Sequence, residues 1–415
     1  MRDELGLNYT TDSSECVQLF CDALDHYLAS SVQVMPTLEK LFERDPAMPM
    51  ALLFRAYLLK QAADPRFRAA IYQCFDTLSA RPDLNDREQR HLKALSLWQA
   101  DQMTDAVAVL DDIVISYPGD MLALRIAHHL HFYSGDGKQM LASLQVALEN
   151  QEPKNRYYGF LKGMHSFALE ESGRYPQAEA AGLEALDINQ KDIWAAHAVT
   201  HVYQMQSRFE EAIPFIDSLL PEWDSANNFV FHLYWHKALQ HIGLGNPDQA
   251  LAVYDKTLVE PLADDFYLDV CNAASLLWRL ELSGLNVGDR WSQLHELSKN
   301  HIQDDELVFT SLHYLMAPAI LGDTKTVKAG LDHFHRWSNE KTSQGAVAKR
   351  VGVTMATALT KLASEQKNDG VKLMLSVQNQ IYRIGGSHAQ RHLFDQLINA
   401  YACLLYTSDA ADEED

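Results

Sequence analysis

Residues 170–190 read EESGRYPQAEAAGLEALDINQ, and this stretch decides how the chain is expected to fold. Gly173 opens a turn, Tyr175 follows two residues later, and Ala178 stands on the helix that comes next. The stretch QMQSRFEEAIPFIDSLL at 204–220 repeats this order 34 residues further on. Small residues at fixed places let two helices approach closely, so each stretch predicts one helix pair joined by a tight turn.

The same frame extends in both directions, and its anchors are spaced 34, 38, 34 and 38 residues apart at Ala106, Met140, Ala178, Ala212 and Ala250. This period resembles the tetratricopeptide repeat, whose helix pairs stack around a concave groove. Strand signals are scarce along the chain. The sequence therefore predicts an all-α fold, a tetratricopeptide-like right-handed helical solenoid (superhelix) of about twenty helices. We expect residues 1–402 to form a single repeat domain.

The composition of the chain limits the kinds of binding partner and the cell compartment that we expect. The 415 residues include 56 acidic and 35 basic ones, a formal net charge of −21, which argues against nucleic-acid and anionic-membrane surfaces. The first twenty residues lack the basic and apolar regions of a signal peptide. Five widely spaced cysteines without a CxxC pair indicate neither a disulfide framework nor a zinc ribbon. We expect a cytoplasmic protein that binds neither nucleic acid nor membrane.

The last thirteen residues, CLLYTSDAADEED at 403–415, depart from the rest of the chain. They interrupt the amphipathic pattern of 390–402 in mid-helix and run into a charged string without a helix stop signal. They resemble a translated sequencing adapter. We expect 403–415 to be a non-native tail.

Histidines gather on the predicted first helices of the repeats. In WAAHAVTHVYQMQ at 194–206, His197 and His201 stand four residues apart, and the repeat frame places both on the face toward the groove. Residues four apart on a helix are neighbours, so one ligand can touch both. His232 and His236 repeat this spacing on the next first helix. The same frame adds Arg125, His129, Glu170 and Trp235 to the groove.

Three interpretations compete for these residues. Histidine pairs on adjacent helices can bind a metal, with His197, His201, His232 and His236 as ligands and Glu170 or Glu171 as a carboxylate. The HExxH signature of metalloproteases is absent because Ala198 follows His197. The same side chains can instead hold a small polar ligand or peptide through hydrogen bonds. The structural alternative is a set of histidines packed between helices. Because only the first of the three interpretations involves a metal, we expect no obligatory cofactor.

Downstream residues extend the candidate groove. Asp269 and Arg279 share one predicted helix, and Arg290 and Trp291 follow its turn. Arginine binds carboxylates through two hydrogen bonds, which suits an anionic ligand, although structural ion pairs explain these residues equally well. Near the end of the chain, a Gly-Gly turn precedes Ser387, a predicted helix N-cap. Arg391 on the first turn of that helix completes the candidate set.

Six segments resemble the tetratricopeptide repeat protein 38 family. They are DREQRHLKAL (86–95), YPGDMLALRIAHHLHFY (117–133), WAAHAVTHVYQM (194–205), HLYWHKALQHIG (232–243), LWRLELSGLNVGDRW (277–291) and GGSHAQRHLF (385–394). The resemblance implies an all-helical repeat superhelix and supplies no activity. It also implies that this chain is a bacterial-type member that is truncated at its C-terminus. Family members look similar at His197, His201, His232, Trp235, His236, Arg279, Arg290, Trp291 and Arg391, whereas His392 stands where members have Asp.

The sequence thus supports one leading functional hypothesis and two alternatives. The leading one is a repeat protein that binds a small polar ligand or a peptide in a groove lined by His, Arg and Trp. The first alternative is an enzyme, a hydrolase or transferase, that uses the same histidines with or without a metal. The second is a scaffold for protein partners, a common use of repeat arrays.

Overall fold

A computed structural model describes the backbone of residues 1–412 and the side chains of residues 1–402. It is helical throughout, and residues 1–412 contain no β-strand, only two isolated bridges. The predicted all-α class is confirmed. Residues 413–415 and the side chains of 403–412 lie outside the described part, and the predicted non-native tail falls there.

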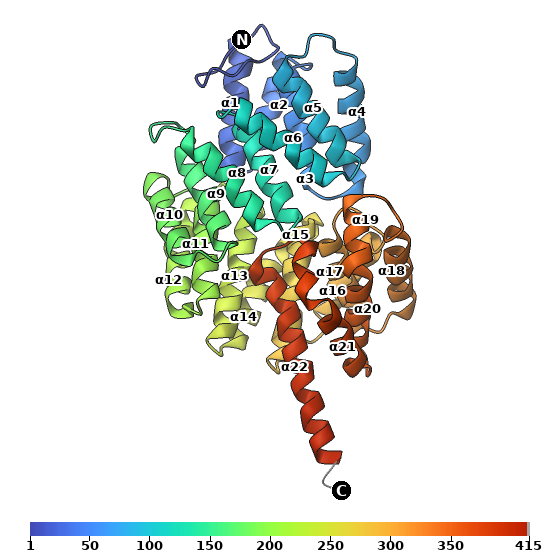
Figure 1. Cartoon of the computed structure of the whole chain (residues 1–415). Coiled ribbons are helices and arrows are strands. Elements are labelled where there is room, and N and C mark those ends of the chain that lie inside the picture. The colour runs from blue at the N-terminus through green and yellow to red at the C-terminus, as the bar shows by residue number, and fades with distance from the viewer. Residues whose placement is uncertain (413–415) are drawn as a thin grey trace. The chain divides into compact units, whose positions relative to one another are not determined.

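The internal contacts of the chain divide it into two compact units, Met1–Val230 and Phe231–Asp415. We call them unit 1 and unit 2 and describe each by itself (Figure 1). That residues 1–402 form a single repeat domain stays a prediction.

Unit 1 is built from twelve α-helices and two 3-10 turns, Pro65–Phe67 and Leu220–Trp223. The helices are α1 (Ser14–Leu28), α2 (Val34–Arg44), α3 (Pro49–Gln61), α4 (Arg68–Ser79), α5 (Asp86–Gln99), α6 (Met103–Ser116), α7 (Met121–Tyr133), α8 (Gly137–Glu149), α9 (Tyr158–Glu170), α10 (Tyr175–Ile188), α11 (Ile193–Met205) and α12 (Phe209–Leu219).

Unit 2 contains the remaining helices together with two π-helical segments, Tyr254–Leu258 and Ala348–Gly352, and two 3-10 segments, Glu260–Asp264 and Gln378–Ile384. Its helices are α13 (Phe229–Gly243, starting two residues before the unit), α14 (Pro247–Val253), α15 (Tyr267–Leu282), α16 (Trp291–His301), α17 (Val308–Ile320), α18 (Thr324–Trp337), α19 (Ser343–Val347), α20 (Val353–Leu362), α21 (Lys367–Val377) and α22 (His388–Asp412).

The predicted turns between paired helices are confirmed. Gly173 after α9 has a φ of +72°, and Ser207 after α11, 34 residues later, has a φ of +56°. In both turns an N–H group donates to a carbonyl five residues earlier, from Arg174 to Leu169 at 2.9 Å and from Arg208 to Tyr203 at 2.8 Å. This is the Schellman pattern, which ends a helix and reverses the chain.

Small residues bring α9, α10 and α11 close together, and these helices pack side by side (Figure 1). A Cβ added to Gly182 on α10 would stand 2.5 Å from Val199 of α11 and 2.8 Å from the hydroxyl of Ser166 on α9. That hydroxyl donates to the carbonyl of Ala178 at 2.6 Å. Only a residue without a side chain fits Gly182, so the sequence sets how closely this trio packs.

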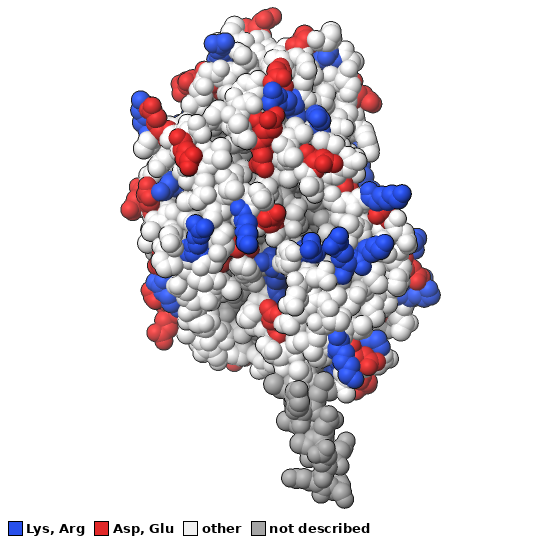
Figure 2. All heavy atoms as spheres, in the orientation of Figure 1, with Lys and Arg blue, Asp and Glu red and all other residues white. Residues whose placement is uncertain are grey.

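The described surface carries charges of both signs. Acidic and basic side chains are interspersed over the face drawn in Figure 2. Within residues 1–412, no helix combines the length and the apolar character needed to cross a membrane.

Candidate functional site in unit 1

The two histidines of α11 lie together in the interior of unit 1. His197 and His201 are 3% and 0% exposed, and the centroids of their rings lie 4.3 Å apart. Asp192 is the N-cap of their helix, and its carboxylate accepts from the N–H groups of Trp194 and Ala195 at 3.1 Å each. This N-cap fixes the start of α11 and thereby the direction in which both imidazoles project.

Helix α9 supplies carboxylates to this pair. Glu170 is fully buried, and its Oε2 lies 3.5 Å from Nδ1 of His201. One ligand atom from each of Glu170, Glu171 and His201 lies within 4.8 Å of the other two. The ring of Phe167 stacks on His197 at 5.3 Å and meets His201 edge-on at 5.5 Å. Two carboxylates and the imidazole of His201 therefore lie close together, and Phe167 packs against the rings of both histidines.

A missing side chain on α9 makes room for the start of α11. A Cβ on Gly163 would stand 2.6 Å from Oδ2 of Asp192 and 3.1 Å from Cβ of Ala195. The first distance is shorter than Cβ atoms show in proteins and the second is unusually short, so a larger residue at Gly163 would force the carboxylate of Asp192 to shift. Gly163 thus sets the separation between the carboxylates of α9 and the histidines of α11.

Helix α7 places a cation and two more histidines beside the first turn of α11. The guanidinium of Arg125 lies 4.0 Å above the centroid of the Trp194 ring, within the range of a cation–π contact. Nδ1 of His129 donates to the carbonyl of Arg125 at 2.9 Å, so that nitrogen carries the proton. The ring of His128 lies 5.8 Å from both Phe167 and Trp194. Arg125 and His128 of α7 therefore pack against side chains of α9 and α11.

Burial controls the charge of the α7 histidines. Burial, followed by the charge of Arg125, lowers the pKa of His129 to about 3 and moves the pKa of His128 well below its usual value. Burial also lowers the pKa of Arg125. Both imidazoles are consequently neutral at physiological pH, and Arg125 provides the positive charge.

Five polar atoms on four residues near Trp194 lack a hydrogen-bond partner among the described residues, although each is buried. They are Nε of Arg125, both ring nitrogens of His128, Oδ2 of Asp192 and Nε1 of Trp194. Burial raises the pKa of Asp192 to about 7, against the lowering effects of two backbone hydrogen bonds and Arg125. Buried polar groups in proteins are normally paired, so this concentration around one tryptophan marks the place as unusual. We call Arg125, His128, Asp192 and Trp194 the Trp194 cluster.

The second predicted histidine pair lies on α13 in unit 2. The rings of His232 and His236 are buried, and their centroids lie 4.7 Å apart. Nδ1 of His232 donates to Oδ1 of Asn272 at 3.0 Å, and Trp235 donates from Nε1 to the hydroxyl of Ser275 at 3.1 Å. That the pairs on α11 and α13 share one ligand stays a prediction.

The predicted residues on α15 are buried, and Arg279 has backbone partners. Its guanidinium donates to the carbonyl of Ala389 at 2.9 Å and to Oε1 of Gln396 at 3.0 Å, both on α22. It also lies 5.5 Å above the ring of Trp235, and burial lowers its pKa to about 9. Asp269 is 3% exposed. Arg279 thus fastens α22 to α15 within unit 2.

The remaining predicted residues also have neighbours in unit 2. Arg290 forms a two-point ion pair with Asp255, both contacts at 2.7 Å. Trp291 donates from Nε1 to Glu281 at 3.0 Å. Arg391 donates to the carbonyl of Gly386 in the Gly-Gly turn. The contact between Arg290 and Asp255 is a structural ion pair between Arg and Asp, the alternative that the sequence left open.

Ser387 has the predicted capping role. Its hydroxyl accepts from the N–H of Gln390 at 3.2 Å, and the side chain of Gln390 accepts from the N–H of Ser387 at 2.9 Å. Gly385 and Gly386 precede it with φ values of +80° and +75°, a conformation that favours glycine. Ser387 therefore caps α22 in the way that the sequence predicts.

Sequence reasoning missed three members of the Trp194 cluster, namely His128, Asp192 and Trp194. The repeat frame selects His129 as the groove residue, whereas the ring of its neighbour His128 also contacts Trp194. Asp192 carries a recognisable signal, an aspartate directly before a helix. Trp194 looks like an ordinary core residue in the sequence, because its contacts with α7 and α9 depend on how the helices pack.

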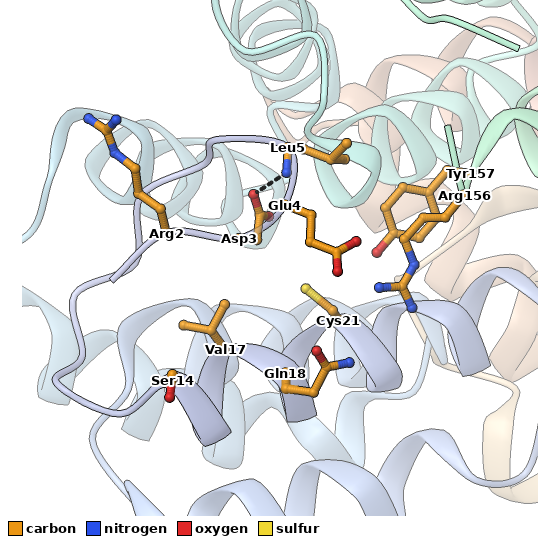
Figure 3. Close-up of a pocket in the computed structure, with 10 residues that line it drawn as sticks. All are labelled: Arg2, Asp3, Glu4, Leu5, Ser14, Val17, Gln18, Cys21, Arg156 and Tyr157. Carbon is orange, nitrogen blue, oxygen red and sulfur yellow. Dashed lines mark hydrogen bonds between the residues drawn. The ribbon is translucent and has the colours of Figure 1, made fainter. Parts of the chain in front are cut away.

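A hollow of about 210 Å³ lies elsewhere in unit 1, beside the N-terminal segment (Figure 3). Asp3 and Glu4 line it together with Cys21 of α1, Arg156 and Tyr157. Arg156 pairs with Asp25 at its edge, and burial raises the pKa of Cys21 to about 11. The thiol is therefore protonated and unreactive at neutral pH. The sequence predicted no site at this hollow.

A search against known protein families found no family model that matches the chain. Membership of the tetratricopeptide repeat protein 38 family stays a prediction from the six resembling segments.

Proposed function

We propose that unit 1 binds a small polar ligand that carries a carboxylate, either a free small molecule or the end of a peptide, at the Trp194 cluster. The observation that carries this proposal is the group of buried polar atoms without hydrogen-bond partners on Arg125, His128, Asp192 and Trp194. A buried donor that is left unpaired costs about 1–3 kcal/mol, and a ligand that pairs several of them recovers that free energy.

The hydrogen-bond donors of the Trp194 cluster determine which kind of ligand it can bind. Arg125 and Trp194 can only donate, and neutral His128 donates from one nitrogen. Asp192, with its pKa at about 7, is protonated in a large share of molecules and then donates as well. Donors therefore outnumber acceptors, and the charge of Arg125 favours an anion. A carboxylate supplies two acceptor oxygens and one negative charge, which satisfies both requirements.

We further propose that the helix pairs of the chain stack as a tetratricopeptide-like right-handed solenoid of the protein 38 type. The turns after α9 and α11 support this, because they have the same hydrogen bonds 34 residues apart. In this arrangement the first helices of successive repeats are neighbours, which is how α9 and α11 come into contact.

The test combines native mass spectrometry of the protein as purified with ligand-observed NMR, in which succinate is the added probe. We expect a retained small molecule or saturation transfer to succinate in the wild type. Trp194→Phe and His128→Phe should abolish it, because each removes a donor and keeps an aromatic ring. Trp98→Phe on α5 is the matched control, since it alters a buried tryptophan of unit 1 outside the Trp194 cluster.

Thermal unfolding of the ligand-free proteins separates binding from structure. Replacing an unpaired buried imidazole by an apolar ring should leave the melting temperature equal or higher. A wild type that retains no molecule and shows no transfer from succinate would contradict the proposal. A large fall in the melting temperature of ligand-free His128→Phe would instead assign His128 a structural role.

A further inference from the structure

The carboxylates of α9 and the histidines of α11 form a second chemical group, one to two turns along α11 from the Trp194 cluster. We propose that Glu170, Glu171 and His201 bind a divalent transition-metal ion such as Zn²⁺. All three residues belong to unit 1. This inference does not depend on the proposed binding of a carboxylate, because it uses different side chains.

The distance between the ligand atoms of His201 and Glu170 fits two ligands of one metal ion better than a direct hydrogen bond between them. Nδ1 of His201 and Oε2 of Glu170 lie 3.5 Å apart, which is long for a charge-assisted hydrogen bond of about 2.7–2.9 Å. Ligands at about 2.1 Å from a tetrahedral Zn²⁺ lie roughly 3.4 Å from one another. The third ligand atom, from Glu171, lies within 4.8 Å of both, a distance that side-chain rotation can shorten.

The charges also fit a divalent cation. Glu170 is fully buried, and two carboxylates together with a divalent ion make a neutral group. The imidazole of His201 adds a neutral ligand. Nitrogen ligands in this set favour zinc, iron or cobalt over calcium and magnesium, which prefer oxygen alone.

Neighbouring residues hold the ligands in place. Phe167 contacts the rings of both His197 and His201, which restricts their rotation and keeps water away from one side. The ring centroids of the two histidines lie 4.3 Å apart, so His197 packs against the ring of the ligand His201. Apolar surroundings of this kind strengthen the attraction between a cation and its ligands.

The test is titration of the full chain, after treatment with a chelator, with Co²⁺, whose visible absorption reports tetrahedral nitrogen and oxygen ligands. We expect one Co²⁺ ion per chain, displaced by Zn²⁺. Glu170→Gln and His201→Gln should each weaken binding by at least about 100-fold, because loss of even an outer-shell partner typically costs 10–100-fold. Glu171→Gln, at a half-buried position, gives the same readout with less risk to folding.

Two matched variants complete the experiment. His131→Gln replaces a buried histidine that pairs with Asp111 on α6, and Glu184→Gln replaces a carboxylate of α10 that pairs with Lys162. Both should bind Co²⁺ as the wild type does. Failure of the wild type to bind one Co²⁺ ion overturns the proposal. Unchanged affinity in Glu170→Gln, Glu171→Gln and His201→Gln, with their helical circular dichroism intact, overturns it equally.

Discussion

Asp192 makes the stability of unit 1 depend on pH in a direction opposite to that of most aspartates. Its carboxylate caps α11 through two backbone hydrogen bonds, yet burial raises its pKa to about 7, above the ordinary value of about 3.9. The folded protein therefore binds this proton more tightly than the unfolded chain does. Stability is greatest at low pH and falls as pH rises from about 4 to about 7, because the folded protein must then ionise a buried group.

The size of the effect follows from the two pKa values. Between about pH 5 and pH 7 the free energy of unfolding should fall by about 2 kcal/mol through this one carboxyl. A change of that size shifts the melting temperature of a unit of 150–250 residues by about 4–8 °C. Asp192→Asn keeps the shape of the side chain and remains a good N-cap, but it does not titrate.

The assay is thermal unfolding of the wild type and Asp192→Asn, followed by circular dichroism at several pH values. Other titrating groups are common to both proteins, so they cancel in the difference between the two melting temperatures. That difference should grow in favour of Asp192→Asn by about 4–8 °C between about pH 5 and pH 7. A difference that stays constant with pH would refute the argument that burial controls the proton on Asp192.

Two further predictions concern one residue in each unit. Gly163→Ala should destabilise unit 1 by about 1–3 kcal/mol, since its Cβ would stand 2.6 Å from Oδ2 of Asp192; an unchanged melting temperature would show that α9 and α11 separate freely. In unit 2, burial lowers the pKa of His301, but hydrogen bonds to Asp304 at 2.6 Å and Asp265 at 2.9 Å raise it to about 9. The stabilisation is present below about pH 6.5 and is lost as pH rises to about 9, so His301→Gln should lower the melting temperature at pH 6 and have little effect above pH 9. NMR titration of the imidazole checks that pKa directly, and a midpoint near 6.5 would contradict it.

The local turns could be predicted from the sequence because their chemistry is local. Gly173 and Ser207 stand at equivalent places of a 34-residue period, and both end their helices with the same backbone hydrogen bonds. Ser387 is a similar case, since a serine after two glycines and before a helix is a recognisable N-cap. Such features depend on residues within one turn of each other, which is the range that sequence patterns report.

The partners of the polar side chains could not be predicted, because they depend on how helices rotate against one another. The repeat frame identifies the face on which Arg125 lies, but the contact with Trp194 joins residues 69 positions apart in sequence (194 − 125). Arg279 donates to the carbonyl of Ala389 on a helix 110 residues away. No periodicity encodes such pairings, since they follow from close approaches such as the one that Gly163 permits.

Packing alone does not require the polar residues of α7, α9 and α11. Phe167 and Trp194 already supply aromatic contacts along these helices, and replacing buried charged groups by apolar ones of similar size is often neutral or stabilising. The interior of unit 1 nevertheless holds the carboxylate of Glu170 at 0% exposure and the imidazole of His128 at 1%. Glycine and alanine determine how closely the helices pack, and the burial of polar groups among them costs free energy. The carboxylate proposed to bind at His128 and the metal ion proposed to bind at Glu170 would each offset part of that cost.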